Sequence, residues 1–198
     1  MNPPDSVIHP VWLRVTHWLN VLAVVLMVMS GWRIFNASPF WGLHIPEGVT
    51  LGGWLGGALR WHFAAMWLLA INGLLYLLLN LGSGRFKAKY WPITPRTLWA
   101  DLRAALTGHL AHDNLREYNA VQRAAYLFIV LDLIVLVMSG LVLWKSVQFP
   151  LLRTLMGGYE GARAVHFIAM ALLVAFVIVH VVMVALVPRT LLAMIRGR

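Results

Sequence analysis

Long runs of apolar residues, separated by shorter polar segments, are the main pattern along this chain of 198 residues. Four runs are long enough to cross a bilayer, which requires roughly 20 mostly apolar residues. They cover approximately residues 15–35, 61–81, 124–144 and 164–187. Because these runs are nearly free of charge, the pattern predicts an all-α integral membrane protein. We expect a four-helix bundle formed by a single domain, residues 1–198.

The segments that connect the runs differ in length and composition. Residues 36–60 are rich in glycine and tryptophan, and tryptophan is enriched at membrane–water interfaces. Residues 82–122 form the longest loop, in which residues 95–107 predict an amphipathic surface helix. The third and fourth runs are connected by a shorter loop around KSVQFPLLRTLMGGYEG.

The composition agrees with a membrane protein and indicates its orientation. Hydrophobic residues make up 61% of the chain and charged residues 12%, whereas soluble domains have about 25% charged residues. Eleven of the 16 lysines and arginines lie in the chain ends and the long loop, and five lie in the other two loops. The positive-inside rule therefore places both termini and the long loop in the cytoplasm.

The net charge of +9 and the absence of cysteine narrow the classes of partner and cofactor. Basic residues near the cytoplasmic surface attract anionic lipid headgroups, so membrane lipid is an expected partner. No basic array interleaved with aromatic residues indicates a nucleic acid partner. A chain without cysteine has no disulfide, thiolate zinc site, iron–sulfur cluster or covalently attached c-type haem.

Four of the eight histidines lie within the predicted helices: His17, His62, His166 and His180. Ionisable side chains at membrane depth are rare and usually functional. The predicted topology places His17 and His180 near the cytoplasmic face, and His62 and His166 near the outer face. Fourteen positions separate His166 from His180, which corresponds to about 21 Å and nearly four helical turns. The last helix therefore offers one histidine to each of two sites stacked across the membrane.

Two histidines at each depth fit bis-histidine ligation of b-type haem, which is held without covalent bonds. A zinc site would need four protein ligands, or three and a water molecule, and no carboxylate cluster accompanies the histidines. A proton relay would not require the pairing. The pattern predicts two haem b groups, one with iron ligands His62 and His166 and one with iron ligands His17 and His180.

An arginine precedes three of these histidines by two or three positions: Arg14, Arg60 and Arg163. Arginine can bind a haem propionate with two parallel hydrogen bonds, so the three arginines are candidate cofactor contacts. The alternative is that they serve membrane topology or contact lipid. That alternative fits Arg14 better than the two arginines on the outer side.

Other residues have two interpretations each. The first and third runs contain VMSGW and VMSGL, in which Gly31 and Gly140 either allow close helix packing or leave room for a flat ligand. Asp132, the one acid within a run, either hydrogen-bonds to a neighbouring helix or helps to carry a proton. The remaining histidines are interpreted as surface residues: His9, His44, His109 and His112.

Several segments resemble the cytochrome b subunits of membrane-bound formate dehydrogenase (its gamma subunit) and of nickel–iron hydrogenase, which are similar to prokaryotic cytochrome b561. RVTHWLNVLAVVLMVMSGW resembles their R-x-x-H-W start of the first helix, and EYNAVQRAAYLFIVLDLIVLVMSGLVLW resembles the Y-N-A-x-Q start of a later one. VHFIAMALLVAFVIVH matches the paired histidines of the fourth helix in spacing, and PRTLLAMIRGR resembles the surface segment after it. The resemblance covers nearly the whole chain.

The resemblance implies two haems b in a four-helix bundle, with quinone chemistry near the cytoplasmic haem. Residue by residue, it assigns the same two histidine pairs as iron ligands. Asn119 matches the asparagine on the quinone side, with Tyr118 and Gln122 as neighbours. The alternative for Asn119 is an N-cap of the third membrane helix, because asparagine caps helices well. Shorter relatives imply a periplasmic partner subunit of the molybdopterin oxidoreductase kind.

We therefore expect a multi-pass dihaem cytochrome b of the bacterial inner (plasma) membrane. Such a subunit transfers electrons between a periplasmic oxidoreductase partner and the quinone pool of a respiratory chain. The first alternative is a free-standing cytochrome b561-like quinone or superoxide oxidoreductase, in which a basic funnel would attract the anion. The second is a non-redox membrane anchor or transporter, although transporters usually contain repeats and broken helices.

Overall fold

Helices form nearly all of the structure, a computed structural model that describes residues 8–86, 93–107 and 118–197; these ranges contain no strand. Four helices are long and apolar enough to cross a membrane: α1 (Val11–Phe35), α2 (Leu55–Gly82), α5 (Ala120–Trp144) and α7 (Gly158–Leu186). The predicted all-α membrane architecture with four spans is thereby confirmed. The cytoplasmic location of the termini stays a prediction.

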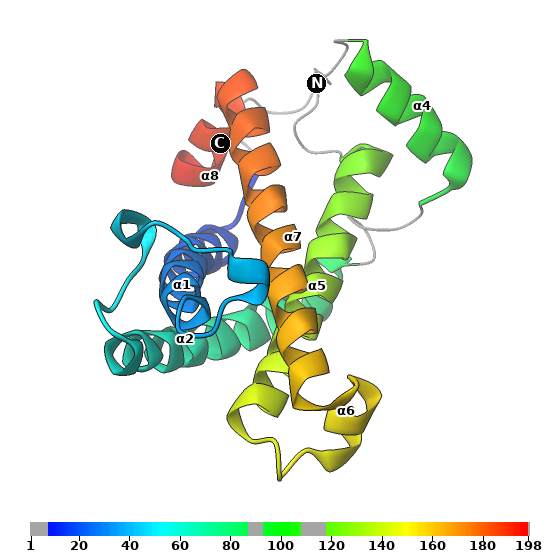
Figure 1. The fold of residues 1–198 in the computed structure, drawn as a ribbon. Coiled ribbons are helices and arrows are strands. Elements are labelled where there is room, and N and C mark those ends of the chain that lie inside the picture. Colours follow the sequence, from blue (N-terminus) through cyan, green and yellow to red (C-terminus); the bar gives the residue numbers. More distant parts are fainter. Residues whose placement is uncertain (1–7, 87–92, 108–117, 198) are drawn as a thin grey trace, which may run out of the picture. The chain divides into compact units, whose positions relative to one another are not determined.

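The chain divides into two compact units, and each is built on one pair of long helices (Figure 1). The first unit comprises residues 1–85 and 192–198 and contains the α1–α2 pair. The second comprises residues 86–191 and contains the α5–α7 pair. Three shorter helices accompany these pairs: α4 (Pro95–Leu106), α6 (Pro150–Leu155) and α8 (Pro188–Arg196).

Small side chains fill the interior of the first unit. Ala23, Ser30 and Ala58 are fully buried, whereas Trp67 and Ile71 are 55% and 66% exposed. This distribution is the reverse of that in a soluble protein, and it suits helices that pack through small residues and expose large apolar side chains to lipid. The exposed apolar surface therefore supports insertion in a membrane.

One buried amide connects α1 and α2 through hydrogen bonds. Asn72 on α2 donates from Nδ2 to the Thr16 carbonyl oxygen at 2.8 Å and to Asn20 Oδ1 at 2.7 Å. Thr16 and Asn20 lie on α1 on either side of His17 in the sequence. Because a polar group in hydrocarbon needs a partner within the protein, these bonds set the pairing of the two helices beside His17.

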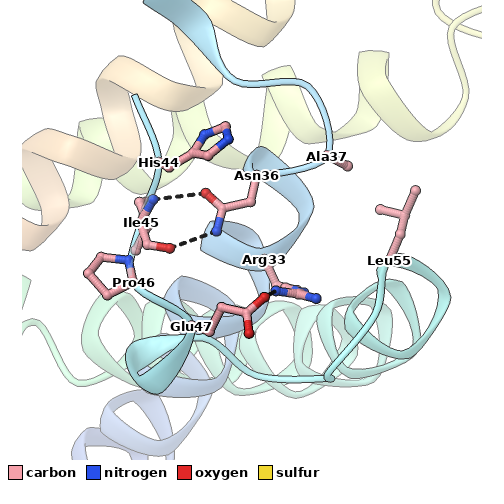
Figure 2. Close-up of a pocket in the computed structure, with 8 residues that line it drawn as sticks. All are labelled: Arg33, Asn36, Ala37, His44, Ile45, Pro46, Glu47 and Leu55. Carbon is pink, nitrogen blue, oxygen red and sulfur yellow. Dashed lines mark hydrogen bonds and ion pairs between the residues drawn. The ribbon is translucent and has the colours of Figure 1, made fainter. Parts of the chain in front are cut away.

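The loop between α1 and α2 is held in place by polar contacts to the end of α1 (Figure 2). The Asn36 side chain donates to the Ile45 carbonyl oxygen at 2.8 Å and accepts from the Ile45 backbone N–H at 2.9 Å. Arg33 forms an ion pair with Glu47 at 2.6 Å. Short 3₁₀ turns at Phe40–Gly42 and Glu47–Val49 complete the loop. The glycine-rich segment thus has a defined structure.

The second unit includes the predicted surface helix. α4 ends at Leu106, one residue before the predicted end, and Trp99 and Leu102 on it are exposed. Asp101 of α4 accepts a 2.6 Å hydrogen bond at Oδ2 from the Ala120 backbone N–H at the start of α5. A carboxylate is favourable at this position because helix N-termini carry positive partial charge. This hydrogen bond therefore holds α4 against the start of α5.

The segment after the last membrane helix is also helical and returns to the first unit. The Ile8 backbone N–H donates to the Gly197 carbonyl oxygen at 2.8 Å. Arg14 Nη1 donates to the Ile195 carbonyl oxygen at 2.7 Å. The end of α8 is thereby held against the start of α1. Of the histidines interpreted as surface residues, His44 is exposed and His9 is half-buried, and His109 and His112 lie outside the described residues.

Candidate functional site

The four helix histidines are distributed equally between the two units. His17 lies on α1 and His62 on α2, whereas His166 and His180 both lie on α7. α7 is continuous from Gly158 to Leu186, so the two histidines share one uninterrupted helix. All four side chains are half-buried. The assignment of these residues to two iron sites stays a prediction.

A serine of the neighbouring helix contacts one histidine in each unit. Ser30 Oγ lies 3.0 Å from Nδ1 of His62, and Ser139 Oγ lies 2.9 Å from Nδ1 of His166. Each serine stands five positions before the last residue of its helix. Both serines are fully buried. The α1–α2 and α5–α7 pairs therefore hold a histidine in the same way.

The glycine after each serine faces the same histidine ring. A Cβ added to Gly31 would lie 3.4 Å from Cε1 of His62, and one added to Gly140 would lie 3.4 Å from Cε1 of His166. Each glycine thus lets the imidazole of the neighbouring helix approach its backbone closely. The two interpretations of these glycines, close helix packing and room for a flat ligand, stay predictions.

These residues fit axial ligation of haem iron. Histidine binds haem iron through a ring nitrogen, and metal-binding histidines almost always hydrogen-bond through the other nitrogen. Because the serines contact Nδ1 of His62 and His166, Nε2 is the nitrogen that each ring presents to a metal. Gly31 and Gly140 add no side chain beside these two rings, which is compatible with a flat group there.

The other two histidines have aromatic neighbours. The His17 ring stands edge-on to Trp18, with 5.4 Å between ring centroids. The His180 ring is stacked on Phe176 at 5.9 Å, with 9° between the ring planes. The Asn72 hydrogen bonds to Thr16 and Asn20 fix the backbone around His17.

The three candidate propionate-binding arginines each contact another part of the chain. Arg14 donates to the Ile195 carbonyl oxygen, as described above. Arg60 lies over the Trp54 ring, 5.7 Å from its centroid. Arg163 forms an ion pair with Glu160 at 2.7 Å. A guanidinium has five N–H donors, so these contacts are compatible with a further role, and the cofactor contact stays a prediction.

The three candidate quinone-binding residues lie together at the start of α5. Asn119 is the N-cap: its side chain accepts from the Gln122 backbone N–H at 2.7 Å, and the Gln122 side chain accepts from the Asn119 N–H at 3.1 Å. The Tyr118 ring packs on Tyr126, 5.1 Å between centroids. The capping alternative for Asn119 is therefore observed, and quinone contact stays a prediction.

The buried acid Asp132 lies on α5, seven positions before Ser139. It is 6% exposed, and its Oδ2 atom has no hydrogen-bond partner in the part of the chain that the structure describes. Neither of its two predicted roles, a hydrogen bond to a neighbouring helix or proton transfer, is decided by this placement.

An open pocket of about 480 Å³ lies in the loop of the first unit (Figure 2). Its lining includes the Arg33–Glu47 ion pair, Asn36 and the exposed His44. Figure 2 shows the Asn36 side chain directed at the backbone of Ile45, so the pocket wall is part of the hydrogen-bonded loop. The four helix histidines are not among its lining residues.

The functional contacts that sequence reasoning missed are those of Ser30, Ser139 and Asp101. The repeated VMSG draws notice to its glycines, whereas the serine beside each of them is ordinary at helix contacts. A usable signal existed: a histidine follows the serine by 32 positions in the first pair and by 27 in the second. Each serine lies five residues before the end of its helix, and each histidine lies seven or eight residues after the start of the next long helix, so the two contacts occupy similar positions in their helix pairs.

Comparison with known proteins gives one family and two relatives. Residues 8–197 match the family model described as prokaryotic cytochrome b561. The chain is 69% identical over 197 residues to "Putative protein-methionine-sulfoxide reductase subunit YedZ1" of Azospira oryzae, covering 100% of both chains. It is 26% identical over 188 residues to "Probable Ni/Fe-hydrogenase B-type cytochrome subunit" of Cupriavidus necator, covering 85% of this chain and 74% of the relative.

Proposed function

Because this chain belongs to the prokaryotic cytochrome b561 family, as its sequence predicts, we propose that it carries electrons between a periplasmic oxidoreductase and membrane quinone. The chain is a multi-pass membrane protein and a b-type cytochrome. The proposal adds two haems, the quinone and the side of the membrane on which the partner docks. Its natural location is the bacterial inner membrane.

The repeated serine–histidine contact is the observation that carries the proposal. His62 and His166 each present Nε2 because a serine contacts Nδ1. In a b-type cytochrome, such histidines would hold the haem iron. We assign His62 and His166 to the outer haem and His17 and His180 to the inner haem, in agreement with their predicted depths.

Bound haem supplies one-electron redox chemistry, and the protein holds the group and sets its surroundings. The chain's own residues would do three things. The four histidines would hold the haem irons, while Gly31 and Gly140 would add no side chain beside the rings of His62 and His166. Arg14, Arg60 and Arg163 offer positive charge for propionates, and the apolar faces of the helices exclude water.

The relatives support a redox partner. One is named as a subunit of a protein-methionine-sulfoxide reductase and the other as a hydrogenase cytochrome subunit. We propose that this chain likewise serves an oxidoreductase subunit, with the 69% identity favouring a methionine-sulfoxide reductase. The proposed partner is a periplasmic subunit of the molybdopterin oxidoreductase class.

The start of α5 is the proposed quinone region. Tyr118, Asn119 and Gln122 lie at this end of the helix, next to Asp101 of α4. Their polar groups sit where a membrane helix leaves the apolar layer, and a quinone head group could exchange protons with water there. The hydrogen bonds between Asn119 and Gln122 hold these residues in place at the edge of the proposed quinone site.

A visible spectrum with pyridine haemochrome quantitation of the purified protein tests the proposal. We expect two haem b per chain, and loss of one in His62→Ala. Reduction by a quinol should be followed optically in the same preparation. A colourless protein, or one haem per chain in the wild type, contradicts the dihaem proposal. Failure of any second subunit to copurify from the native host favours a free-standing quinone oxidoreductase.

A further inference from the structure

We propose that Ser30 and Ser139 are positioning residues that fix the tautomer of His62 and His166 and lower the reduction potential of the haem bound to them. This inference rests on the proposed haem ligation by the two histidines. It adds a role for two serines outside the ligand set.

A serine hydroxyl has one proton to donate and two lone pairs that accept. Ser30 Oγ donates that proton to the Leu26 carbonyl oxygen, at 2.6 Å. Its contact with Nδ1 of His62 must therefore be one in which the ring donates and Oγ accepts. Ser139 donates to the Val135 carbonyl oxygen at 2.7 Å and likewise accepts from the His166 ring, for which the Leu136 carbonyl oxygen is a further acceptor.

The consequence for each ring is a defined tautomer. A neutral imidazole has one N–H and one basic nitrogen. With the N–H on Nδ1, the basic lone pair is on Nε2, which is the form that binds a metal. The serine also restricts rotation of the ring, since Oγ is itself held by its own helix. Both restrictions are present without a cofactor.

The electronic consequence has a definite sign. A hydrogen bond from Nδ1–H to an acceptor raises the basicity of the imidazole, and a more basic ligand favours the oxidised iron. The serines therefore lower the reduction potential, and their removal raises it. A neutral hydrogen bond of this kind changes an equilibrium constant about threefold to tenfold, and a tenfold change corresponds to about 59 mV for one electron.

Redox titration of Ser30→Ala and Ser139→Ala holoprotein tests the proposal, with Ser83→Ala as the matched control. Ser83 Oγ donates to the Leu79 carbonyl oxygen at 2.6 Å, as the other serines do to theirs, but it is exposed at the end of α2. We expect two haems in every variant. Ser30→Ala should raise the potential of the haem that His62→Ala removes, and Ser83→Ala should leave it unchanged.

The proposal is overturned if Ser30→Ala and Ser139→Ala have the same potentials as Ser83→Ala. Absence of haem from the wild type would instead refute the proposed function, so the two failures are distinct. If His62 and His166 ligate one iron, both serine variants shift the same haem. The proposal requires only that each variant shift the haem of its own histidine.

A second measurement applies even if a serine variant loses haem during purification. In His62→Gly protein, added imidazole can replace the ligand and donate an N–H to Ser30, whereas 1-methylimidazole has a methyl group at that position. We expect the affinity ratio of imidazole to 1-methylimidazole, from optical titration, to fall about threefold to tenfold when Ser30→Ala is added. An unchanged ratio contradicts the proposal.

Discussion

Arg14 Nη1 donates a 2.7 Å hydrogen bond to the carbonyl oxygen of Ile195, and this contact joins the first turn of α1 to the last turn of α8. The carbonyl groups at the end of a helix lack partners within it, so a guanidinium is well placed there. The residue expected to bind a propionate thus has a structural role in the same unit.

Replacement of Arg14 should separate these two roles. In Arg14→Ala, we expect trypsin to cleave after Arg189 and Arg196 more rapidly than in the wild type, because the end of α8 has lost a partner. Arg103→Ala on the surface helix is the control. If Arg14 also binds a propionate, the inner haem content falls in parallel. Unchanged proteolysis would show that the contact contributes little.

Double histidine variants should reveal the ligand pairing. We expect His62→Ala/His166→Ala to retain one haem per chain, because both residues are assigned to the same iron. His62→Ala/His180→Ala should retain none. Pyridine haemochrome analysis of both proteins, with helical content checked by circular dichroism, measures the outcome. Equal haem content in the two double variants is incompatible with pairing by depth.

Substitution of Asn119 should distinguish capping from quinone contact. Serine caps helices about as well as asparagine, whereas alanine costs about 1 kcal/mol. If Asn119 acts only as a cap, Asn119→Ser keeps quinol oxidation at the wild-type rate and Asn119→Ala loses stability. A direct contact predicts a lower rate in both variants with unchanged haem content. Stopped-flow reduction by a quinol provides the rate.

The loop between α1 and α2 should respond to acid through Glu47. The Arg33 guanidinium, by hydrogen bond and charge, holds the pKa of Glu47 below its ordinary value of 4.5. A lowered pKa means that the ion pair is fully present above pH 4.5 and is lost as the pH falls through the lowered value. Hydrogen exchange of residues 36–49 should therefore accelerate in acid. The Glu47→Gln protein should lack this acid-dependent step.

The buried amide of Asn72 should stabilise the α1–α2 pair. Hydrogen bonds between membrane helices contribute about 0.6 kcal/mol on average and up to about 1.7 kcal/mol. We expect Asn72→Ala to lower the free energy of unfolding in mixed micelles by an amount in this range. Asn80→Ala is the control, because the Asn80 amide donates to Tyr76 of its own helix at 2.9 Å. Equal effects of the two variants would argue against a role in helix pairing.

Hydropathy located all four membrane helices but not their starts. α7 begins at Gly158, six residues before the predicted span, and α2 begins at Leu55 rather than at residue 61. An apolar run marks only the part of a helix that lies in hydrocarbon. The start of α5 at Ala120, four residues before the predicted span, is set by the cap of Asn119 and Gln122, which has no hydropathy signal.

The candidate site could be predicted only as a set of residue types. Histidine is conspicuous in an apolar helix, so the four candidates were evident in the sequence. The serines were not, because serine is ordinary at helix contacts and its partner lies in another helix. For the arginines, proximity to a histidine in the sequence suggested a contact with haem. The structure shows that Arg14 also has a hydrogen-bond partner and Arg163 an ion-pair partner within the chain.

The contact between Ser30 and His62 lies wholly within one helical hairpin. During biosynthesis, both residues are therefore in the membrane before the final helix has left the ribosome. The later helices are not needed to orient the His62 side chain. Each helical hairpin can insert into the membrane as a preformed half of the protein, and haem binding follows translation.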